Sequence, residues 1–149
     1  MTKLESVRPT ADDFPALTEL WEASVRATHH FLPESDILFF KPLVQNQYLG
    51  LVELVALKEP EGKFHGFLGV LNGKIEMLFI DPESRGQGCG KRLLQIALEE
   101  LKATELDVNE QNEQAVGFYQ KMGFEVTGRS PVDGMGKPYP LLHMKCKST

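Results

Sequence analysis

The sequence predicts one α/β domain in which a mixed β-sheet is covered by helices on both faces. Strand-like and helix-like segments follow one another in the order β-α-α-β-β-β-α-β-α-β-β, which is typical of such a layered sheet. The segment Lys74–Ile80 is almost continuously apolar, as expected of a strand buried on both faces. The chain has 149 residues and contains no repeat, low-complexity tract or linker, so we expect one hydrophobic core region and one domain, residues 1–149.

The composition argues against several classes of protein. A net charge of -5 and a pI near 5.4 argue against a nucleic-acid-binding protein, which normally carries a basic surface. No apolar segment approaches the ~20 residues that span a bilayer, and no apolar run follows Lys3, so neither a membrane segment nor a signal peptide is expected. Cys89 and Cys146 are too few for a disulfide framework, and no histidine or cysteine has metal-site spacing. We therefore expect a cytoplasmic protein without a metal.

The first elements are a strand and a helix. A short strand is expected over Glu5–Arg8. Thr10 and Asp13 then have the spacing of a helix capping box, with aspartate in place of the usual glutamate. The helix behind them should end near Thr28. Its apolar residues recur at helical spacing and are Phe14, Leu17, Leu20, Trp21 and Val25.

A second helix and two strands follow. The helix is expected from Ser35 towards Tyr48, and Pro42 should limit or kink it because proline lacks an N–H and clashes with the preceding turn. Val52–Leu57 and Phe64–Leu71 have the composition of strands, with a turn between them. Asn72 and Gly73 form a strong hairpin signal, so Phe64–Leu71 should pair with the apolar strand that follows.

The second half of the chain predicts alternating helices and strands. A helix is expected from about Gly88 to Lys102, with an inner leucine-rich stripe, followed by a short strand over Leu106–Val108. Asn112 is placed as the N-cap of a helix over Glu113–Met122, and Gly123 is expected at its C-cap with a left-handed backbone. The last two strands are expected at Phe124–Thr127 and Pro140–Lys145.

The most informative segment is the loop Arg85–Arg92, which reads RGQGCGKR. Its three glycines allow positive φ angles and a close approach of the backbone to a ligand. The loop leads from a buried strand into a helix, where unpaired N–H groups and the helix dipole favour an anion. Arginine and lysine side chains add positive charge in an otherwise acidic protein. The pattern therefore predicts a site for a pyrophosphate group.

Two other glycine-loop motifs do not fit this segment. The dinucleotide-binding motif G-x-G-x-x-G would need its third glycine at Lys91 or at Leu93, depending on the starting glycine. A nucleotide P-loop would need glycine in place of Arg85 and serine or threonine in place of Arg92. A purely structural turn remains as the alternative, but such a turn would not require three flanking cations.

The loop resembles the acetyl-CoA signature of the GCN5-related N-acetyltransferase (GNAT) superfamily. That signature, Q/R-x-x-G-x-G/A, is matched by Arg85, Gly88 and Gly90, with Ile80 ending the buried strand five residues earlier. The stretch Asn109–Phe124 is similar to the second cofactor motif of the superfamily, and its FYQKMGF ending is specific. Segments near both ends of the chain also resemble small bacterial acetyltransferases of the YjaB type.

This resemblance implies a fold and a reaction. In the GNAT fold, two parallel strands of the mixed sheet splay apart and form the acetyl-CoA cleft. Here the cleft would lie between Leu78–Ile80 and Leu106–Val108. The implied reaction is transfer of an acetyl group from acetyl-CoA to a primary amine by direct attack, with a peptidyl-lysine as the acceptor suggested by the YjaB type. The implied assembly is a monomer or a homodimer.

The resemblance also implies which residues hold the cofactor. Backbone groups of Leu78 and Ile80 would pair with the pantetheine arm as an added strand does. The amides of Gly86 to Lys91 would hold the pyrophosphate, and Arg85 or Arg92 would add a guanidinium contact. The expected cofactor-binding residues are Leu78, Phe79, Ile80, Arg85, Gly86, Gln87, Gly88, Cys89, Gly90, Lys91, Asn109, Asn112 and Tyr119.

Tyr119 is the expected proton donor to the departing thiolate. It follows Asn112 by seven residues, or about two helical turns, so both can face the cofactor cleft. A phenol with a pKa near ~10 can donate to a thiolate that forms beside it. The alternative is a tyrosine that only packs in the core. Cys89 is not expected to act as a nucleophile, because it lies among the phosphate-binding glycines, at the wrong end of the cofactor.

The general base is less well defined by the sequence. Glu76 lies on the strand beside the expected acetyl site, and strand alternation places it on the face of Leu78 and Ile80 unless a bulge intervenes. His29 is a second candidate, because it lies in the connection between the first two helices. His30 and His143 remain further alternatives, although a lone histidine is more often structural.

Two other functions stay open at this point. An amine-detoxifying or antibiotic-type acetyltransferase would need an acidic acceptor pocket, for which Glu34, Asp36 and Glu53 are candidates. A non-catalytic acyl-CoA sensor would bind the cofactor without turnover. Tyr119 argues against the sensor, because a binding module needs no proton donor there.

Overall fold

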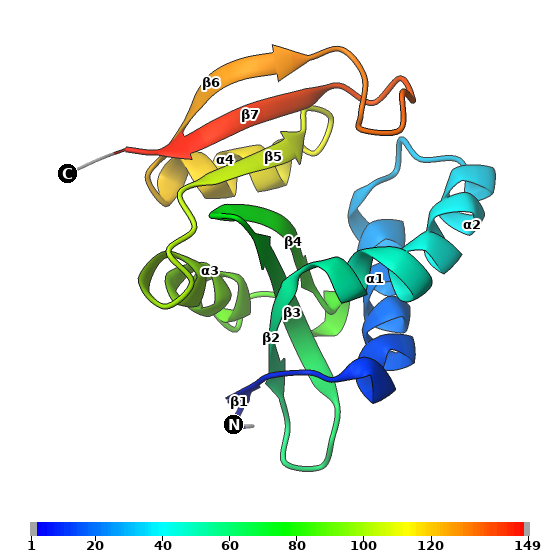
Figure 1. Cartoon of the computed structure of the whole chain (residues 1–149), viewed down its shortest axis with the longest axis vertical. Coiled ribbons are helices and arrows are strands. Elements are labelled where there is room, and N and C mark those ends of the chain that lie inside the picture. Colours follow the sequence, from blue (N-terminus) through cyan, green and yellow to red (C-terminus); the bar gives the residue numbers. More distant parts are fainter. Residues whose placement is uncertain (1–2, 148–149) are drawn as a thin grey trace.

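A computed structural model describes residues 3–147 and contains one mixed sheet with helices on both faces (Figure 1). The sheet has seven strands in the order β1-β2-β3-β4-β5-β7-β6. The strands are β1 Glu5–Val7, β2 Glu53–Lys58, β3 Phe64–Leu71, β4 Lys74–Ile80, β5 Glu105–Asn109, β6 Phe124–Ser130 and β7 Leu141–Cys146. The helices are α1 Phe14–Thr28, α2 Glu34–Leu43, α3 Cys89–Glu99 and α4 Glu113–Lys121. Among the described residues, no helix is both long and apolar enough to cross a membrane.

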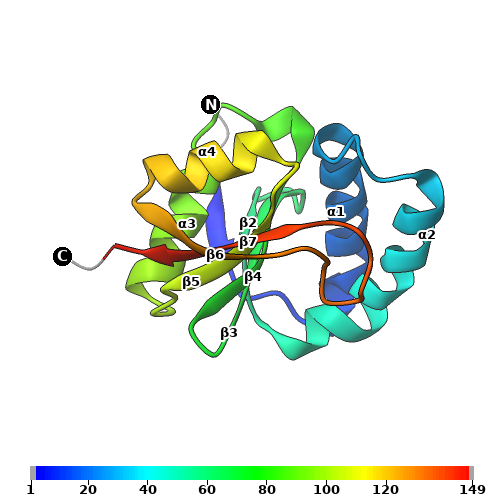
Figure 2. The same cartoon turned by 90° about the horizontal axis from the view of Figure 1, so that it is seen from above.

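Apolar side chains form one core on each face of the sheet. On one face, α3 and α4 pack against strand residues such as Leu68 and Leu106, and both of these leucines are buried. On the other face, α1 and α2 cover Phe67 and Met77. Figure 2 shows the two groups of helices on opposite sides of the strands. The predicted fold class is confirmed.

The strands β4 and β5 are parallel and pair over only two positions. Lys74 pairs with Glu105 and Ile75 with Leu106, while the other strand pairs of the sheet are antiparallel. Beyond these two positions the strands separate, so residues 77–80 of β4 pair with β3 alone. Among residues 3–147, the separation leaves one edge of β4 without a strand partner in the middle of the sheet.

A β-bulge in β4 begins at the same place. Gly69 of β3 pairs with Met77 and Val70 pairs with Ile75, so Glu76 is an extra residue in β4. An extra residue disrupts the ladder, bends the strand and changes which face the following side chains occupy. The bulge and the separation of β4 from β5 therefore coincide.

The predicted helices and strands are present, and the boundaries of α3, β6 and α2 differ from the prediction by more than one residue. The helix expected up to Lys102 ends at Glu99, because Lys102 adopts a positive φ of 55° and the amide of Ala103 donates to Ala97 O at 2.9 Å. Strand β6 extends to Ser130 rather than Thr127. Pro42 lies inside α2, after which the chain continues as a π-helical turn, Val44–Tyr48, and a 3₁₀ turn, Leu49–Leu51.

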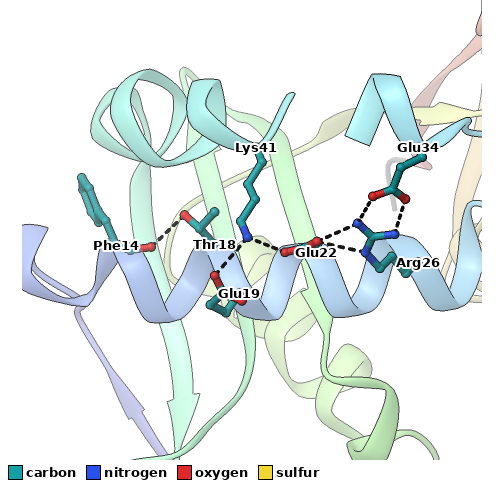
Figure 3. A network of polar contacts seen from close by, with 7 residues as sticks. All are labelled: Phe14, Thr18, Glu19, Glu22, Arg26, Glu34 and Lys41. Carbon is teal, nitrogen blue, oxygen red and sulfur yellow. Dashed lines mark hydrogen bonds and ion pairs between the residues drawn. The ribbon is translucent and has the colours of Figure 1, made fainter. Parts of the chain in front are cut away.

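Ion pairs fix α2 against α1 (Figure 3). Arg26 donates to both carboxylate oxygens of Glu34, at 2.5 and 2.7 Å, and to Glu22 at 2.9 Å. Glu22 also contacts Lys41 at 2.6 Å. Single exposed pairs contribute about 0–1 kcal/mol, but these contacts share residues and join α1 to both ends of α2. They hold the connection between the two helices, which contains His29.

Candidate active site

A cavity of about 360 Å³ lies where β4 ends and the glycine-rich loop begins. Its walls come from the end of α1, from β4, from the loop with the start of α3, and from α4. The lining residues are Ser24, Thr28, His29, Leu78, Phe79, Ile80, Ser84, Arg85, Gly86, Gly88, Cys89, Gly90, Lys91, Asn112, Gln114, Ala115, Phe118 and Tyr119. We call this space the first cavity. It contains eleven of the thirteen residues expected to bind the cofactor; Gln87 and Asn109 do not line it.

The backbone of the loop needs its glycines for their conformation. Gly86 has a φ of 77° and Gly88 a φ of 79°, and a Cβ atom added at either position would meet no other atom within 4 Å. The reason for glycine is therefore the left-handed backbone, which other residues adopt at a cost of about 1–2 kcal/mol. With left-handed backbone at these two glycines, the loop leads into α3, and Gly88 is the N-cap of this helix.

The start of α3 offers unpaired amides next to positive charge. Arg92 N donates to Gly88 O at 3.0 Å, so the amides that precede Arg92 lie before the first helical hydrogen bond. Arg85 and Lys91 line the cavity beside them. Arg92 does not, because its guanidinium donates to Leu4 O at 2.9 Å. Amides, helix dipole and two cations together suit a diphosphate.

The unpaired edge of β4 continues the cavity away from the loop. Leu78, Phe79 and Ile80 line it, and they belong to the stretch that pairs with β3 alone. An extended ligand that carries amide groups can pair with such an edge as another strand would. The diphosphate site and the free strand edge thus form one continuous surface, which fits the pantetheine diphosphate of coenzyme A.

Tyr119 is buried in the wall of this cavity. Its ring makes edge contacts with Phe118 and Phe124, with centroids 5.3 and 5.9 Å away. Burial raises the pKa of the Tyr119 phenol above its usual value, so the group keeps its proton at neutral pH. Asn112 lines the same cavity and caps α4 by accepting from Ala115 N at 3.3 Å. The predicted capping role of Asn112 is confirmed.

A second cavity of about 210 Å³ lies between β4, α1, α2 and the loop from β6 to β7. Five aromatic side chains line it, together with two carboxylates. The lining residues are Trp21, Val25, His29, Leu32, Phe40, Val44, Tyr48, Glu76, Met77, Phe79, Asn109, Asp133 and Tyr139. His29 and Phe79 also line the first cavity, so the two cavities adjoin at these residues.

Glu76 belongs to the second cavity because of the β4 bulge. Strict strand alternation would place it with Leu78 and Ile80, which line the first cavity. The extra residue in β4 instead puts Glu76 on the face of Met77 and Phe79. The expected position of Glu76 is therefore wrong. Asn109, expected on the cofactor side, also lines the second cavity.

His29 lies where the cavities adjoin, and its imidazole is a weak base. Burial, with a smaller contribution from the neighbouring His30, lowers the pKa of His29 to about 4. Its Nδ1 lies 2.7 Å from Thr28 Oγ1, and its ring packs 5.3 Å from that of Phe31. At neutral pH the ring is uncharged, so it can form part of the wall without repelling a cation.

The remaining candidates do not fit a catalytic role: two histidines lie outside both cavities, and the cysteine thiol is buried. His143 contacts Asp107 at 2.6 Å and Ser130 at 2.7 Å and lines neither cavity, and neither does His30. Cys89 is buried, and burial raises the pKa of its thiol, which disfavours the nucleophilic thiolate.

The carboxylates proposed for an acidic acceptor pocket form ion pairs and hydrogen bonds outside the two cavities. Glu34 pairs with Arg26 and Glu53 with Arg8. Asp36 contacts Lys137 at 3.2 Å and accepts a hydrogen bond from the Tyr139 hydroxyl. None of the three lines either cavity.

Several lining residues were missed by sequence reasoning, and two of them come from a distant loop. Asp133 and Tyr139 come from the loop between β6 and β7, which packs against α2 through the contacts of Tyr139 and Lys137 with Asp36. These contacts join residues about 100 positions apart, with separations of 101 and 103. No local signal in the loop predicts them.

Comparison with known proteins decides the family. The family model of the acetyltransferase (GNAT) domain matches residues 20–147. This chain belongs to the GNAT acetyltransferases. It is therefore an acetyl-CoA-dependent N-acetyltransferase, and the GNAT resemblance read from the two motifs is confirmed.

Relatives and solved structures agree with this assignment. The peptidyl-lysine N-acetyltransferase YjaB of Salmonella typhimurium is 45% identical over 128 residues, which cover 86% of this chain and 88% of the relative. The solution structure of apo-YjaB from Escherichia coli aligns with a TM-score of 0.89 and 39% identity, over 99% of each chain. A Thermoplasma acidophilum N-acetyltransferase solved with coenzyme A shares the fold, with a TM-score of 0.75 and 20% identity, over 97% of this chain and 99% of that one.

The neighbouring arginines Arg85 and Arg92 allow a matched test of the phosphate site. Arg85→Gln removes a cation that lines the first cavity, so the Kd for acetyl-CoA should rise about tenfold or more, as for a lost charge-assisted contact. Arg92→Gln removes the same charge from a side chain turned towards Leu4, and the Kd should change less than about twofold. Isothermal calorimetry measures both; equal effects of the two variants would contradict the assignment.

The partly buried imidazole of His29 should make the stability of the protein depend on pH. Because its pKa falls from 6.5 unfolded to about 4 folded, the unfolded state binds the proton more tightly. The neutral imidazole therefore contributes to the free energy of unfolding. This contribution, about 3 kcal/mol, is fully present above pH ~6.5 and is lost as the pH falls towards 4. The unfolding free energy of the wild type should thus decrease more over this range than that of His29→Gln, measured by urea denaturation. The exposed His30→Gln should follow the wild type, and parallel curves for all three proteins would disprove the burial effect.

Proposed function

We propose that this acetyltransferase moves the acetyl group directly to the ε-amino group of a lysine in a polypeptide. The observation that carries the proposal is the junction of the two cavities at His29 and Phe79. A thioester in the first cavity and an amine in the second would meet there. The lysine is suggested by the YjaB relatives of Salmonella typhimurium and Escherichia coli, which are named peptidyl-lysine N-acetyltransferases.

The residues of the first cavity would hold and orient the donor. Amides from Gly86 to Lys91, with the Arg85 guanidinium, would bind the diphosphate. The free edge of β4 at Leu78 and Ile80 would pair with the pantetheine amides and direct one N–H towards the thioester oxygen. Acetyl-CoA supplies the activated acetyl group.

The residues of the second cavity would receive and activate the amine. The aromatic walls suit the aliphatic part of a lysine side chain, and Glu76 supplies a carboxylate at the strand bulge. Glu76 would accept the proton that the ammonium must lose, directly or through a water. His29 is the weaker candidate, because burial makes its imidazole a poor base, with a pKa of about 4, and an uncharged ring does not attract an ammonium group as a carboxylate does.

The amine nitrogen attacks the thioester carbon, so a C–N bond forms and the C–S bond breaks. The nitrogen loses two protons in total: Glu76 takes the first from the ammonium group and passes it to the solvent, and then takes the second once the C–N bond has formed. The Tyr119 phenol gives its proton to the departing thiolate and regains one from Glu76 or the solvent, so one proton is released for each acetyl group transferred. Burial raises the pKa of Tyr119, so the phenol holds its proton at neutral pH and is available as a donor when the thiolate charge forms beside it.

Tyr119→Phe tests the acid with the least change in packing. The phenylalanine ring preserves the edge contacts with Phe118 and Phe124, so folding and the Kd for acetyl-CoA should stay unchanged. Loss of a positioned proton donor should lower kcat about 100-fold or more. Release of free thiol measures turnover on a lysine peptide, and mass spectrometry locates the acetyl group. Equal losses of kcat and affinity would mean that Tyr119 only packs.

Glu76→Gln tests the base in the same assay. It should lower kcat at neutral pH by a similar factor and make the rate rise more steeply with pH, because the amine must then lose its proton to the solvent. If kcat is unchanged in this variant, the general base is a group other than Glu76. If the wild type acetylates small amines readily and no lysine peptide, the polypeptide acceptor is wrong.

A further inference from the structure

Glu59, His65 and Ser84 form a chain of hydrogen bonds that the mechanism above does not use. Glu59 Oε1 lies 2.6 Å from His65 Nε2, and Ser84 Oγ lies 2.7 Å from His65 Nδ1. His65 is 6% exposed and Ser84 1% exposed. Because a carboxylate can only accept, His65 Nε2 carries a hydrogen, and Nδ1 of the neutral ring accepts from the Ser84 hydroxyl. The chain therefore fixes the orientation of the imidazole and of the serine together.

The same three residue types form the catalytic triads of serine hydrolases. A serine nucleophile must reach an acyl carbon, but Ser84 is almost completely buried. Buried polar side chains that pair with one another restrain their orientation more narrowly than apolar packing does. The chain is therefore suited to holding a segment in place, and the segment concerned is the one that contains Ser84.

His65 holds the turn that begins the glycine-rich loop. The pairing of β3 with β4 ends at Gly66 and Ile80, and one further backbone bond joins Asp81 N to His65 O at 2.9 Å. Ser84 N then donates to Asp81 O at 2.8 Å, which closes the turn. Beyond the end of the strand ladder, the side chain of His65 attaches Ser84 to β3.

The loop after Ser84 has few restraints of its own. Among residues 3–147, no backbone hydrogen bond outside the helices and strands involves residues 85–87. Two glycines of the loop have positive φ, and glycine has more backbone freedom to lose on ordering than any other residue. The conformation of this segment therefore depends on its two ends, which are Ser84 and α3. Arg85, which lines the first cavity, comes directly after Ser84.

We propose that Glu59, His65 and Ser84 are positioning residues that hold Arg85 and the loop amides in the geometry that binds the diphosphate of the donor. The inference goes beyond the function proposed above, because it concerns the donor alone, and it rests on the diphosphate site at the loop. A loop that is ordered before binding loses less conformational entropy on binding, which strengthens the affinity. The effect should be confined to ligands that carry a diphosphate.

Ser84→Ala removes the hydroxyl that joins the loop to His65. The Kd for acetyl-CoA, measured by calorimetry, should rise about fivefold. KM for S-acetylpantetheine, a donor without the diphosphate, should stay within about twofold with the same amine acceptor. When Ser84→Ala is combined with Arg85→Gln, the Kd should rise by less than the product of the two single effects, because a poorly held Arg85 has already lost part of its contact.

Thr18→Val is the matched control. It removes a buried hydroxyl that donates to Phe14 O within α1, and Thr18 lines neither cavity. The Kd for acetyl-CoA should therefore stay within about twofold of the wild type.

Glu59→Ala tests the same chain from its exposed end and serves if Ser84→Ala fails to fold. Glu59 lies between β2 and β3 and lines neither cavity. Its loss leaves the His65 ring less firmly oriented, so the Kd for acetyl-CoA should rise about two- to fivefold. Glu59→Gln should restore the wild-type Kd, because the amide oxygen still accepts from His65 Nε2.

The outcomes separate this inference from the assignments on which the rest of the site depends. Equal losses for acetyl-CoA and S-acetylpantetheine would mean a general structural role and would overturn it, as would an unchanged Kd in both Ser84→Ala and Glu59→Ala. If Arg85→Gln itself leaves the Kd unchanged, the diphosphate does not bind at the loop, and this inference is wrong with that site. Failure of the lysine acceptor would alter none of these comparisons, since they require only an amine that the enzyme acetylates.

Discussion

The interruption of β4 at Glu76 is the feature on which the rest of the site depends. Pairing with β5 stops after Ile75, and the bulge adds one residue to β4 at the next position. Without the separation, the backbone of Leu78 to Ile80 would be used in strand pairing. Without the bulge, strand alternation would place Glu76 on the same face as Leu78 and Ile80. The backbone groups of β4 that lose their strand partner, at some cost in stability, are therefore the same groups that are free to bind a ligand.

The same strand connects the two cavities. Leu78 and Ile80 belong to the first cavity and Met77 to the second, while Phe79 lines both. The core against α3 and the core against α1 and α2 hold β4 from its two faces, and this one strand lines both cavities. A rigid strand of this kind suits a reaction in which two substrates must meet at a fixed separation, since positioning supplies a large part of the rate in such transfers.

Local sequence signals predicted the parts of the site that depend on local backbone geometry. The glycines of the loop, the cap at Asn112 and the helix that carries Tyr119 all follow from residue type and spacing within one segment. The face occupied by Glu76 did not follow, because a bulge arises from the pairing of β4 with β3 and not from the residues of β4 alone. The direction of Arg92 depends on Leu4, which is distant in the sequence. Asp133 and Tyr139 join the site through contacts with α2 that no local pattern predicts.

Amide hydrogen exchange along β4 tests the central claim most directly. We expect NMR of the free protein to show at least one rapidly exchanging amide among residues 77–80, because one edge of this stretch has no strand partner. Saturating coenzyme A should slow its exchange, together with that of amides between Gly86 and Lys91. The account would be contradicted if all amides of residues 77–80 were already protected in the free protein, or if bound coenzyme A left their exchange unchanged.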